Sequence, residues 1–531
     1  MFATKAQLQI GGCSEIGNGV WKVFLGNFYE NEMRTKEKTV RLGTDIFDLA
    51  QNNSRGIDSG FRAILISILL FLLTNPLWAG KIIYPWRATT AIVTAGENFE
   101  IWFAADDGQT ASSVKLQGPF NTIATKVDVI TGEWVYDQMS GNSYNTRIKV
   151  TVPTGTPADR YSIILNTSTQ QERSSGAVKV IAKPETNYYV LHFSDTHTFK
   201  NSDESKWSLN KVSTFVDIAN IIDPAMVIIT GDNISNINDE KVNKYFNGVE
   251  DEGVKGLSDI HAATFMAAGN HDAPGANHRG KSPMELAKFW NTHFGLQDYH
   301  FSYGEARFMV INDSWSVDHN HQVDAHLAWL EKKGMGNLRV GACHKVLEEE
   351  LIKSWQSEAD IDYILGGHNH HKGHINPHPV NNKLVAYIAP SREYFMFNLY
   401  KVDGIKGTMT PLGLINSDVL TPGFGRATGL LDATKNPKKR PSKWRSKLTL
   451  KYKEDNNGLA SENTAILVNK FDFEIDAARV RFVMPRGTAY NVSKGTVTQA
   501  FDGDTVHVVD VRVDLKANST TKVQIIPIGQ R

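Results

Sequence analysis

Hydrophobic and polar residues alternate with a period of two along residues 81–184. Phe99, Ile101 and Phe103 form one such run, with polar residues between them. Further runs follow, and turn residues separate them at short intervals. A strand with one buried face gives this alternation, because successive side chains point to opposite sides of a sheet. The pattern therefore predicts an antiparallel β-sandwich over residues 81–184.

The same alternation returns near the end of the chain, where Val509, Val511 and Val513 form the clearest run. We therefore predict a second all-β sandwich over residues 448–531. The first predicted sandwich has about a hundred residues, which is the size of an immunoglobulin-like domain.

A different pattern fills residues 185–401, where short apolar runs alternate with segments of helical spacing. Residues 188–193 read as a strand, and 207–221 carry apolar residues at intervals of three and four. Alternating strands and helices predict an α/β layer architecture. Further strands are expected at 225–229, 264–268, 338–342 and 362–365, and a further helix at 346–355.

The segment 435–447 is rich in Lys, Arg and Pro. A solvated linker has this composition, and so does a basic patch that binds a polyanion. Because the segment lies between two patterned regions, we interpret residues 402–447 as a linker.

Residues 1–60 show no sustained periodicity, and we expect an unstructured or mis-assigned extension there. The apolar run 63–73 is shorter than the roughly 20 residues that span a bilayer. Arg62 precedes it and small residues follow, which is the pattern of a signal peptide. We therefore predict that residues 61–80 are an export signal and that the protein is periplasmic, extracellular or at the cell surface. A membrane anchor through 63–73 and a buried core helix are the alternatives.

Composition narrows the classes of protein further. The 531 residues are enough for two to four domains. There are 57 basic and 57 acidic residues, so the formal net charge of zero gives no nucleic-acid signature. The two cysteines exclude a disulfide framework as the basis of the fold.

Five short polar motifs lie in the α/β region, nearly all directly after predicted strands. Strand ends of an α/β sheet converge on one crevice, so these side chains are expected to meet there. Singly most of the motifs are weak, since a lone histidine is more often a satisfied core residue than a ligand, although the run Gly-Asn-His-Asp is more specific because it has little use in packing. The motifs are Asp195-Thr196-His197, Gly231-Asp232-Asn233, Gly269-Asn270-His271-Asp272, Gly341-Ala342-Cys343-His344 and Gly366-Gly367-His368-Asn369-His370.

As an ordered set, the five motifs resemble the calcineurin-like metallophosphoesterase superfamily, and most closely its class III cyclic nucleotide phosphodiesterase branch. The resemblance covers about residues 188 to 400. It implies a four-layer α/β–β/α sandwich over 185–401, flanked by the two β domains. It also implies that Asp195, His197 and His370 bind one metal ion, that Asn270, His344 and His368 bind a second, and that Asp232 bridges the two.

This ligand set has a consistent chemistry. Mixed carboxylate, imidazole and amide donors suit divalent transition metals such as Mn, Fe or Zn. Two divalent ions against two carboxylates leave a charge of roughly +2, which a hydroxide and a phosphate ester can balance. The resemblance implies that the hydroxide held by the two metals attacks phosphorus and that His271 protonates the leaving oxygen. Asp272 either orients His271 or caps its loop. Relatives place a carboxylate where this chain has Ser235, which puts one supporting contact in doubt.

The predicted function is therefore metal-dependent hydrolysis of a small-molecule or polymeric phosphate ester, with diesters favoured over monoesters. The alternative is a cell-surface binding or adhesion protein with an inactive phosphatase core. The sequence does not decide which residues bind the substrate, and it does not indicate an oligomeric state. Candidates for substrate contacts are His278, His319, His321, Trp315, Tyr394 and Phe395.

Overall fold

The computed structural model divides the chain into two compact units, Met1–Trp78 and Ala79–Arg531. It describes the backbone of residues 8–17, 20–29 and 32–41 in the first unit. In the second unit it describes residues 81–528 except 138–141, 200–204, 236, 275–280, 316–318, 346–354, 356, 369–374, 378–384, 389–395, 413–427 and 430–446. The predicted export signal and residues 346–354 of the predicted helix at 346–355 lie outside these residues. Within the described part of the chain, no helix is both long and apolar enough to cross a membrane.

The first unit contains a three-stranded antiparallel sheet in the order β1-β2-β3. This differs from the extension without regular structure that we expected for residues 1–60. Gly17 pairs with Val20 across Asn18-Gly19, and that dipeptide is the one that two-residue hairpins favour. Two residues are enough to indicate such a hairpin, whereas our prediction for residues 1–60 relied on the absence of a long periodic run. The strands are β1 (Leu8–Gly17), β2 (Val20–Tyr29) and β3 (Glu32–Arg41).

The second unit begins with an all-β domain of two sheets, ordered β4-β6-β10-β9 and β5-β12-β11-β7-β8. Residues from both sheets, including Ile101, Val150 and Ile163, share one buried core. The predicted all-β character is confirmed, whereas the immunoglobulin-like type stays a prediction. The strands are β4 (Lys81–Tyr84), β5 (Ala91–Thr94), β6 (Asn98–Ala104), β7 (Ala111–Gln117), β8 (Thr122–Ala124), β9 (Lys126–Asp137), β10 (Asn142–Thr151), β11 (Arg160–Thr167) and β12 (Gln171–Ile181).

Two mixed sheets form the central domain. In the sheet β15-β14-β13-β22-β23, strands β13, β14 and β15 run parallel, and β24 also pairs with β22. In the sheet β16-β17-β18-β19-β21-β20, strands β17, β18, β19 and β21 run parallel. The strands are β13 (Asn187–Phe193), β14 (Met226–Thr230), β15 (Ala263–Ala267), β16 (Tyr299–Tyr303), β17 (Ala306–Val310), β18 (Leu338–Ala342), β19 (Tyr363–Gly366), β20 (Ile375–Pro377), β21 (Val385–Ile388), β22 (Met396–Asp403), β23 (Thr408–Pro411) and β24 (Thr428–Gly429).

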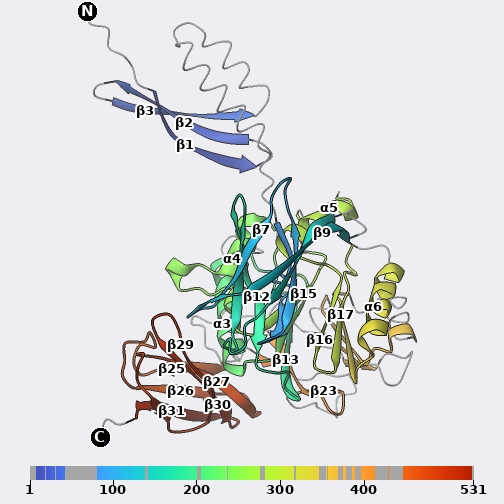
Figure 1. Cartoon of the computed structure of the whole chain (residues 1–531), viewed down its shortest axis with the longest axis vertical. Helices are drawn as coiled ribbons and strands as arrows, with labels where there is room; N and C mark the ends of the chain where they lie inside the picture. The colour runs from blue at the N-terminus through green and yellow to red at the C-terminus, as the bar shows by residue number, and fades with distance from the viewer. Residues whose placement is uncertain are drawn as a thin grey trace, which may run out of the picture. The chain divides into compact units, whose positions relative to one another are not determined.

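An apolar core joins the two sheets of the central domain. Val190 and Ile228 of the first sheet and Phe308 and Val340 of the second belong to one buried cluster. Helix α6 packs beside the second sheet, where Val323 and Leu330 are buried with β-strand residues (Figure 1). The helices are α3 (Ser205–Ile222), α4 (Asp239–Asn247), α5 (Pro283–His293) and α6 (His319–Lys333), with short 3-10 turns η2 (Glu250–Glu252) and η3 (Leu257–Asp259).

The central domain extends past residue 401, which corrects the start of the predicted linker. Strands β22 and β23 pair as a hairpin, with Asp403 opposite Thr408. The Asp403 carboxylate accepts hydrogen bonds from the backbone N–H groups of Ile405 and Lys406, which fixes the turn. Met409 is buried in the core between the sheets, so its burial holds the hairpin in place. The remainder of the predicted linker is mostly outside the described residues.

A second all-β domain ends the chain, as predicted. It has a sheet of order β25-β26-β31-β28 and a sheet of order β27-β30-β29. Its core is continuous with that of the central domain: Phe397 packs on Phe471, and α3 lies against β25 and β27. The strands are β25 (Leu448–Tyr452), β26 (Asn463–Asn469), β27 (Ile475–Met484), β28 (Tyr490–Val492), β29 (Thr496–Asp502), β30 (His507–Leu515) and β31 (Ser519–Pro527).

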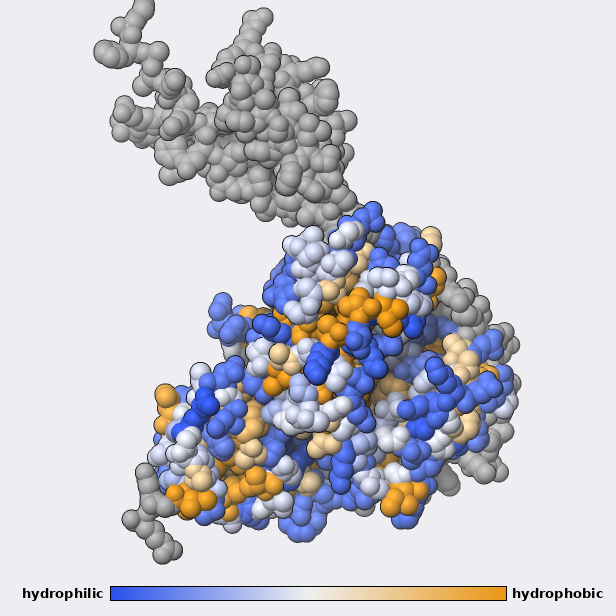
Figure 2. Space-filling model, viewed as in Figure 1, coloured by the Kyte–Doolittle hydropathy of each residue, from blue (hydrophilic) through white to orange (hydrophobic). Residues whose placement is uncertain are grey.

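The surface of the second unit mixes polar and apolar residues, as Figure 2 shows for one face. Among the described residues, Val129, Ile130 and Val135 of the edge strand β9 are exposed. Exposed apolar side chains are common on protein surfaces, and these three do not by themselves define a binding site.

Candidate metal centre

Four predicted ligands of the first sheet follow directly from its parallel strands. Asp195 and His197 come after β13, Asp232 comes after β14, and Asn270 comes after β15. Since β13 pairs with β14 and β14 with β15 in parallel register, their carboxyl ends lie side by side. The parallel pairing of these strands therefore brings the motifs that follow them together, as the sequence predicted.

The second sheet supplies two more predicted ligands. His344 follows β18 and His368 follows β19, and these strands are parallel neighbours. The His344 and His368 rings lie 5.1 Å apart between centroids. The two sheets therefore deliver ligands to one place from opposite sides. His370 lies outside the described residues.

Asp232 occupies the middle of this arrangement. Its Oδ2 atom lies 3.3 Å from His344 Nε2, 3.7 Å from His197 Nε2 and 4.0 Å from His271 Nε2. The Asp232 side chain is buried, and Oδ2 makes no hydrogen bond with any described residue. A buried carboxylate oxygen without a hydrogen bond is costly, so this atom is placed to bind a cation.

The ligand backbone is strained. Asp195, His197, Asp232 and His368 have positive φ angles of 53°, 43°, 55° and 68°. Residues other than glycine rarely adopt this region, and such strain, of about 1–3 kcal/mol each, gathers at functional sites. The surrounding loops therefore fix these side chains at a cost in stability.

Gly269 allows the closest approach between two of the loops. A Cβ atom at this position would overlap the backbone nitrogen and Oδ1 of Asp232. The loops after β14 and β15 can therefore touch only because residue 269 has no side chain. In the same place, the backbone N–H of His271 donates to Asp232 Oδ1 at 2.6 Å. This contact holds the Asp232 carboxylate with its other oxygen facing the imidazoles.

His344 is oriented by the backbone. Its Nδ1 lies 2.7 Å from the carbonyl oxygen of Thr230, so Nδ1 carries the hydrogen that donates to this oxygen. The other nitrogen, Nε2, is left facing Asp232, and it also lies 3.1 Å from Asn270 Oδ1. This is the usual arrangement for a histidine that binds a metal ion through one nitrogen and is held through the other.

The charges at the centre call for a cation. Burial would lower the pKa of His344, but the carboxylates of Asp232, Asp195 and Asp313 outweigh burial and raise this pKa to about 10. Burial would raise the pKa of Asp232, but His344, His197 and His271 lower it below its usual value. The two pKa shifts have one cause, the attraction between the buried carboxylates and positive charge beside them. A metal ion at this place would also supply positive charge.

Among the described residues, two groups of side chains could hold a metal ion. His197, Asp232 and His271 form one, in which His271 is the predicted proton donor and not a predicted ligand, and Asp232, His344 and His368 form the other. The donor atoms of each group lie within 4.8 Å of one another. Asp232 belongs to both. The donors are carboxylate oxygens and imidazole nitrogens, which suit divalent transition metals. The residues present therefore fit the metal chemistry that the sequence predicted.

Comparison with known proteins agrees with this geometry. Residues 188–372 match the model of the calcineurin-like phosphoesterase family. These residues form a calcineurin-like phosphoesterase domain. Members of this family are metal-dependent phosphoesterases, so the domain belongs to a family of hydrolases. The match spans β13 to the start of the segment after β19, and all seven predicted ligands lie within it.

Solved structures add little to this assignment. Vacuolar protein sorting 29 from Cryptosporidium parvum matches with 15% identity and a TM-score of 0.24, over 41% of this chain and 88% of that chain. A putative α-galactosidase from Bacteroides fragilis matches with 11% identity and a TM-score of 0.22, over 84% of this chain and 97% of that chain. Both TM-scores are too low to indicate a shared fold. No curated protein matches this chain.

Asp272 has the hydrogen bonds of a loop cap in the phosphoesterase domain. Its carboxylate accepts from the backbone N–H groups of Asn233, Ile234 and Gly269, at 2.7, 3.2 and 3.1 Å. None of its hydrogen bonds to described residues reaches the His271 side chain. Burial and the nearby Asp232 raise the pKa of Asp272 to about 7, against the effect of the three N–H donors. Asp272 thus ties the loops after β14 and β15 together.

Asp313 is a supporting residue of the phosphoesterase domain that the sequence analysis missed. It lies after β17, and its carboxylate accepts from the backbone N–H groups of His344 and Lys345 at 3.0 and 2.5 Å. The only sequence signal was a carboxylate shortly after a strand. Ser235, where relatives have a carboxylate, places its Oγ 3.4 Å from His197 Nδ1. A weak hydroxyl contact therefore stands at that position.

The predicted substrate-contact residues of the phosphoesterase domain have different outcomes. Trp315 is buried, donates to Gln297 Oε1 and lies edge-on to Trp290, so it is a core residue and not a candidate for substrate contact. The positions His278, Tyr394 and Phe395, and the side chains of His319 and His321, lie outside the described residues.

Proposed function

We propose that this chain is a hydrolase of phosphate esters that uses two divalent transition metal ions and favours diesters over monoesters. The observation that carries the proposal is the Asp232 carboxylate. It is buried, its Oδ2 has no hydrogen bond to a described residue, and three imidazole nitrogens from three loops lie within 4.0 Å of it. A carboxylate shared by two groups of ligands is what a bridging position requires.

The residues divide into two sets around Asp232. Asp195 and His197, together with His370, would hold one ion, and Asn270, His344 and His368 would hold the other. When bound, the ions supply Lewis-acid polarisation of the phosphoryl group and positive charge for the attack of water. The protein supplies rigidity: Asp195 Oδ2 accepts the backbone N–H of His368 at 2.9 Å, which links the two sheets directly.

His271 is suited to give a proton to the leaving oxygen. Its side chain is 32% exposed, whereas those of Asp232 and His344 are buried, so a substrate can reach it. Its ring stands edge-on to His197 at 4.8 Å between centroids, and its own backbone N–H is held by Asp232. An imidazole at the edge of the centre is thus fixed in position and open to solvent, as a general acid needs.

Hydrolysis of two chromogenic esters tests this function. The purified protein is assayed with bis-p-nitrophenyl phosphate and p-nitrophenyl phosphate, with and without Mn²⁺, beside a His344→Ala control. We expect Mn²⁺-dependent turnover of both esters, faster for the diester, and its loss in the control. Faster turnover of the monoester would reject the diester preference. A folded, metal-free protein without turnover of either ester would reject the enzyme and favour the adhesion protein with an inactive core.

The outer layers of the domain support the four-layer architecture. Helix α3 buries Val212, Phe215 and Val216 with residues of the first sheet, and α6 buries Val323 and Leu330 with residues of the second. We propose that these helices cover the outer faces of the two sheets, which pack on each other through their inner faces.

We also propose that the protein is exported, on the basis of the sequence of residues 61–80. The expected result is a mature amino terminus near residue 80 and enzyme outside the cytoplasm. Amino-terminal sequencing of the protein from fractionated cells measures both. An uncleaved chain in the membrane fraction would favour the anchor, and an uncleaved chain in the cytoplasm would reject export.

A further inference from the structure

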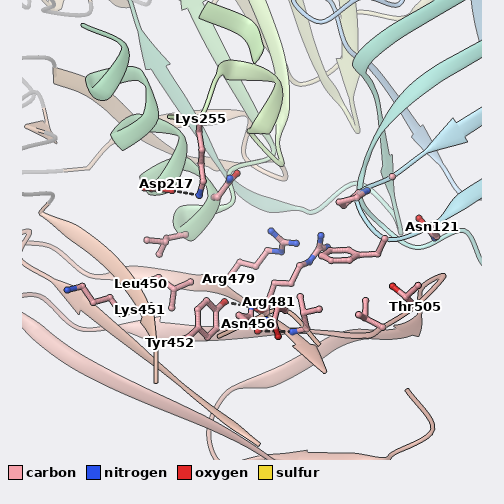
Figure 3. A pocket seen from close by; sticks show the side chains of 18 of the residues that line it. Asn121, Asp217, Lys255, Leu450, Lys451, Tyr452, Asn456, Arg479, Arg481 and Thr505 are labelled. Atoms are coloured by element: carbon pink, nitrogen blue, oxygen red, sulfur yellow. Dashed lines mark hydrogen bonds and ion pairs between the residues drawn. The ribbon is translucent and has the colours of Figure 1, made fainter. Parts of the chain in front are cut away.

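A cavity of about 1080 Å³ lies where the three domains of the second unit meet. The loop after β7 forms one wall, the last turns of α3 form another, and β25, β27 and the β29–β30 loop form the third (Figure 3). Cavities at domain interfaces are preferred places for small ligands, and this one exceeds what a single phosphate ion would fill.

The cavity lies far from the metal centre. Asp217 and Ile221, which line it, belong to the last turns of α3. Because α3 starts after β13 and ends before β14, these turns lie near the amino ends of the strands, whereas the ligands lie at the carboxyl ends. The 18 residues of α3 correspond to about 27 Å. The cavity is therefore a separate place from the proposed active site.

Arg481, at the cavity wall, is fully engaged in structural contacts. Its Nε and Nη2 donate to the two oxygens of Asp510, both at 2.8 Å, and its Nη1 donates to Asp159 at 2.6 Å. Gln499 also donates to Asp510, at 2.7 Å. The Asp510 carboxylate is thus already well supplied with short hydrogen bonds.

Arg479, next to Arg481 in the cavity, makes fewer and longer hydrogen bonds by comparison. Among the described residues, its Nη2 contacts Asp510 at the longer distances of 3.3 and 3.4 Å, and its charge also helps to lower the pKa of the buried Asp159 and Asp223. The side chain is 8% exposed, and its Nε is buried without a hydrogen-bond partner among the described residues. In Figure 3 the side chains of Arg479 and Arg481 extend from the carboxyl-terminal domain into the space between it and the other two domains. A buried guanidinium with an unpartnered Nε–H is a place where an anion would be stabilised.

The rest of the lining indicates the chemistry of the ligand. Four basic and two acidic side chains line the cavity; Arg481 is paired with Asp159 and Asp510, and Lys255 with Asp217, so the excess of basic groups rests on Arg479 and Lys451. The aromatic residues Phe120 and Tyr452 supply apolar surface, and amides and hydroxyls stand between them. A molecule with an anionic group, hydroxyls and apolar ring faces matches all three features. The basic side chains are Lys255, Lys451, Arg479 and Arg481, the acidic ones are Asp217 and Asp504, and the neutral polar ones include Asn121, Asn457 and Thr505.

We propose that this interdomain cavity binds an anionic saccharide, carrying a phosphate or a carboxylate, with Arg479 as its main anion contact. The site is formed by all three domains, so an occupant would hold the two β domains against the phosphoesterase domain. The proposal does not depend on the reaction at the metal centre.

Calorimetric titration tests the proposal, with glucose 6-phosphate and glucuronate as probes and glucose as the uncharged control. An Asp232→Asn background prevents hydrolysis and weakens binding at the metal centre. In that background, Arg479→Gln removes the anion contact, and Thr505→Trp fills the cavity from a residue outside the Arg481 network. Lys494→Gln removes one exposed positive charge of the same domain, outside the cavity. Thermal melting checks that each variant folds.

We expect at least one charged probe to bind with a Kd below about 1 mM, and glucose to bind at least about tenfold more weakly. Arg479→Gln and Thr505→Trp should each weaken binding about tenfold or more, because a charge-assisted contact or the space itself is lost. Lys494→Gln should leave binding unchanged. Binding of one charged probe alone would identify its anion as the preferred group. Binding of neither probe, or binding that survives both cavity variants, would overturn the proposal.

Discussion

Replacing Gly269 by alanine tests whether the two loops at the metal centre must touch. The new Cβ would overlap backbone and carboxylate atoms of Asp232, and the carbonyl carbon of Gly231 would lie only 2.8 Å away. Backbone atoms cannot rotate out of the way as a flexible side chain can. The loop that carries Asp232 must therefore retreat by about 1 Å, and a displacement of that size at a reacting centre costs about 10²-fold in rate.

The assay compares metal content, turnover of bis-p-nitrophenyl phosphate and thermal stability of Gly269→Ala with those of Gly487→Ala. Gly487 also lies in the second unit, but a Cβ there meets no atom within 4 Å, so its variant only adds strain at a positive φ of 77°. We expect Gly269→Ala to lose about 10²-fold in kcat and part of its metal, while it loses about 1–3 kcal/mol of stability from overpacking. Gly487→Ala should keep its activity. Full metal content and activity within about threefold of wild type in Gly269→Ala would refute the reasoning.

Three further changes have distinct expected results. Asp232→Asn should lose both metal affinity and activity, by more than the roughly 10- to 100-fold typical of residues that only support a ligand. Metal analysis measures this, and a variant that retains all of its metal would contradict the bridging role. His271→Gln should keep its metal. Its kcat should fall about 10²–10⁴-fold with an alkyl phosphodiester, but much less with a p-nitrophenyl ester, whose leaving group needs no proton. Equal losses of kcat with both substrates would argue against a general acid. Asp159→Asn should cost about 3 kcal/mol or more at pH 7, because Arg481 loses a buried partner. Burial would raise the pKa of Asp159, but Arg481 and His261 hold it well below its usual value, so its contribution is present above pH 4 and is lost as pH falls below about 4. Urea unfolding at several pH values measures this, and an unchanged acid dependence in the variant would contradict it.

Much of the fold follows from local patterns in the sequence. The period-two runs marked both β domains, and the alternation of strand and helix marked the central domain. Residues such as Trp290 and Phe294, at helical spacing, are buried in the core. Long periodic patterns were insufficient where one or two residues determine a turn. The pairing of β1 with β2 is indicated by only two residues of the sequence, Asn18-Gly19, and the β22–β23 turn depends on one carboxylate, Asp403.

The candidate site was predictable because its residues follow strands in an ordered set. Parallel strands bring their carboxyl ends together, so the order of the motifs along the chain translates into proximity in space. Asp313 was not predictable in this way, since its role depends on a contact with His344, 31 residues away. The contact between Asp159 and Arg481 joins residues 322 positions apart in two different domains. Nothing local in either sequence segment indicates such a partner.

The most direct test of the central claim is the number of metal ions that the active enzyme holds. The purified protein is stripped with a chelator and titrated with Mn²⁺, while bound metal and turnover of bis-p-nitrophenyl phosphate are measured on the same samples. Asp232 as a bridge between two groups of ligands predicts two ions per chain, with turnover that rises mainly with the second. Full turnover with one ion or none would contradict the two-metal site.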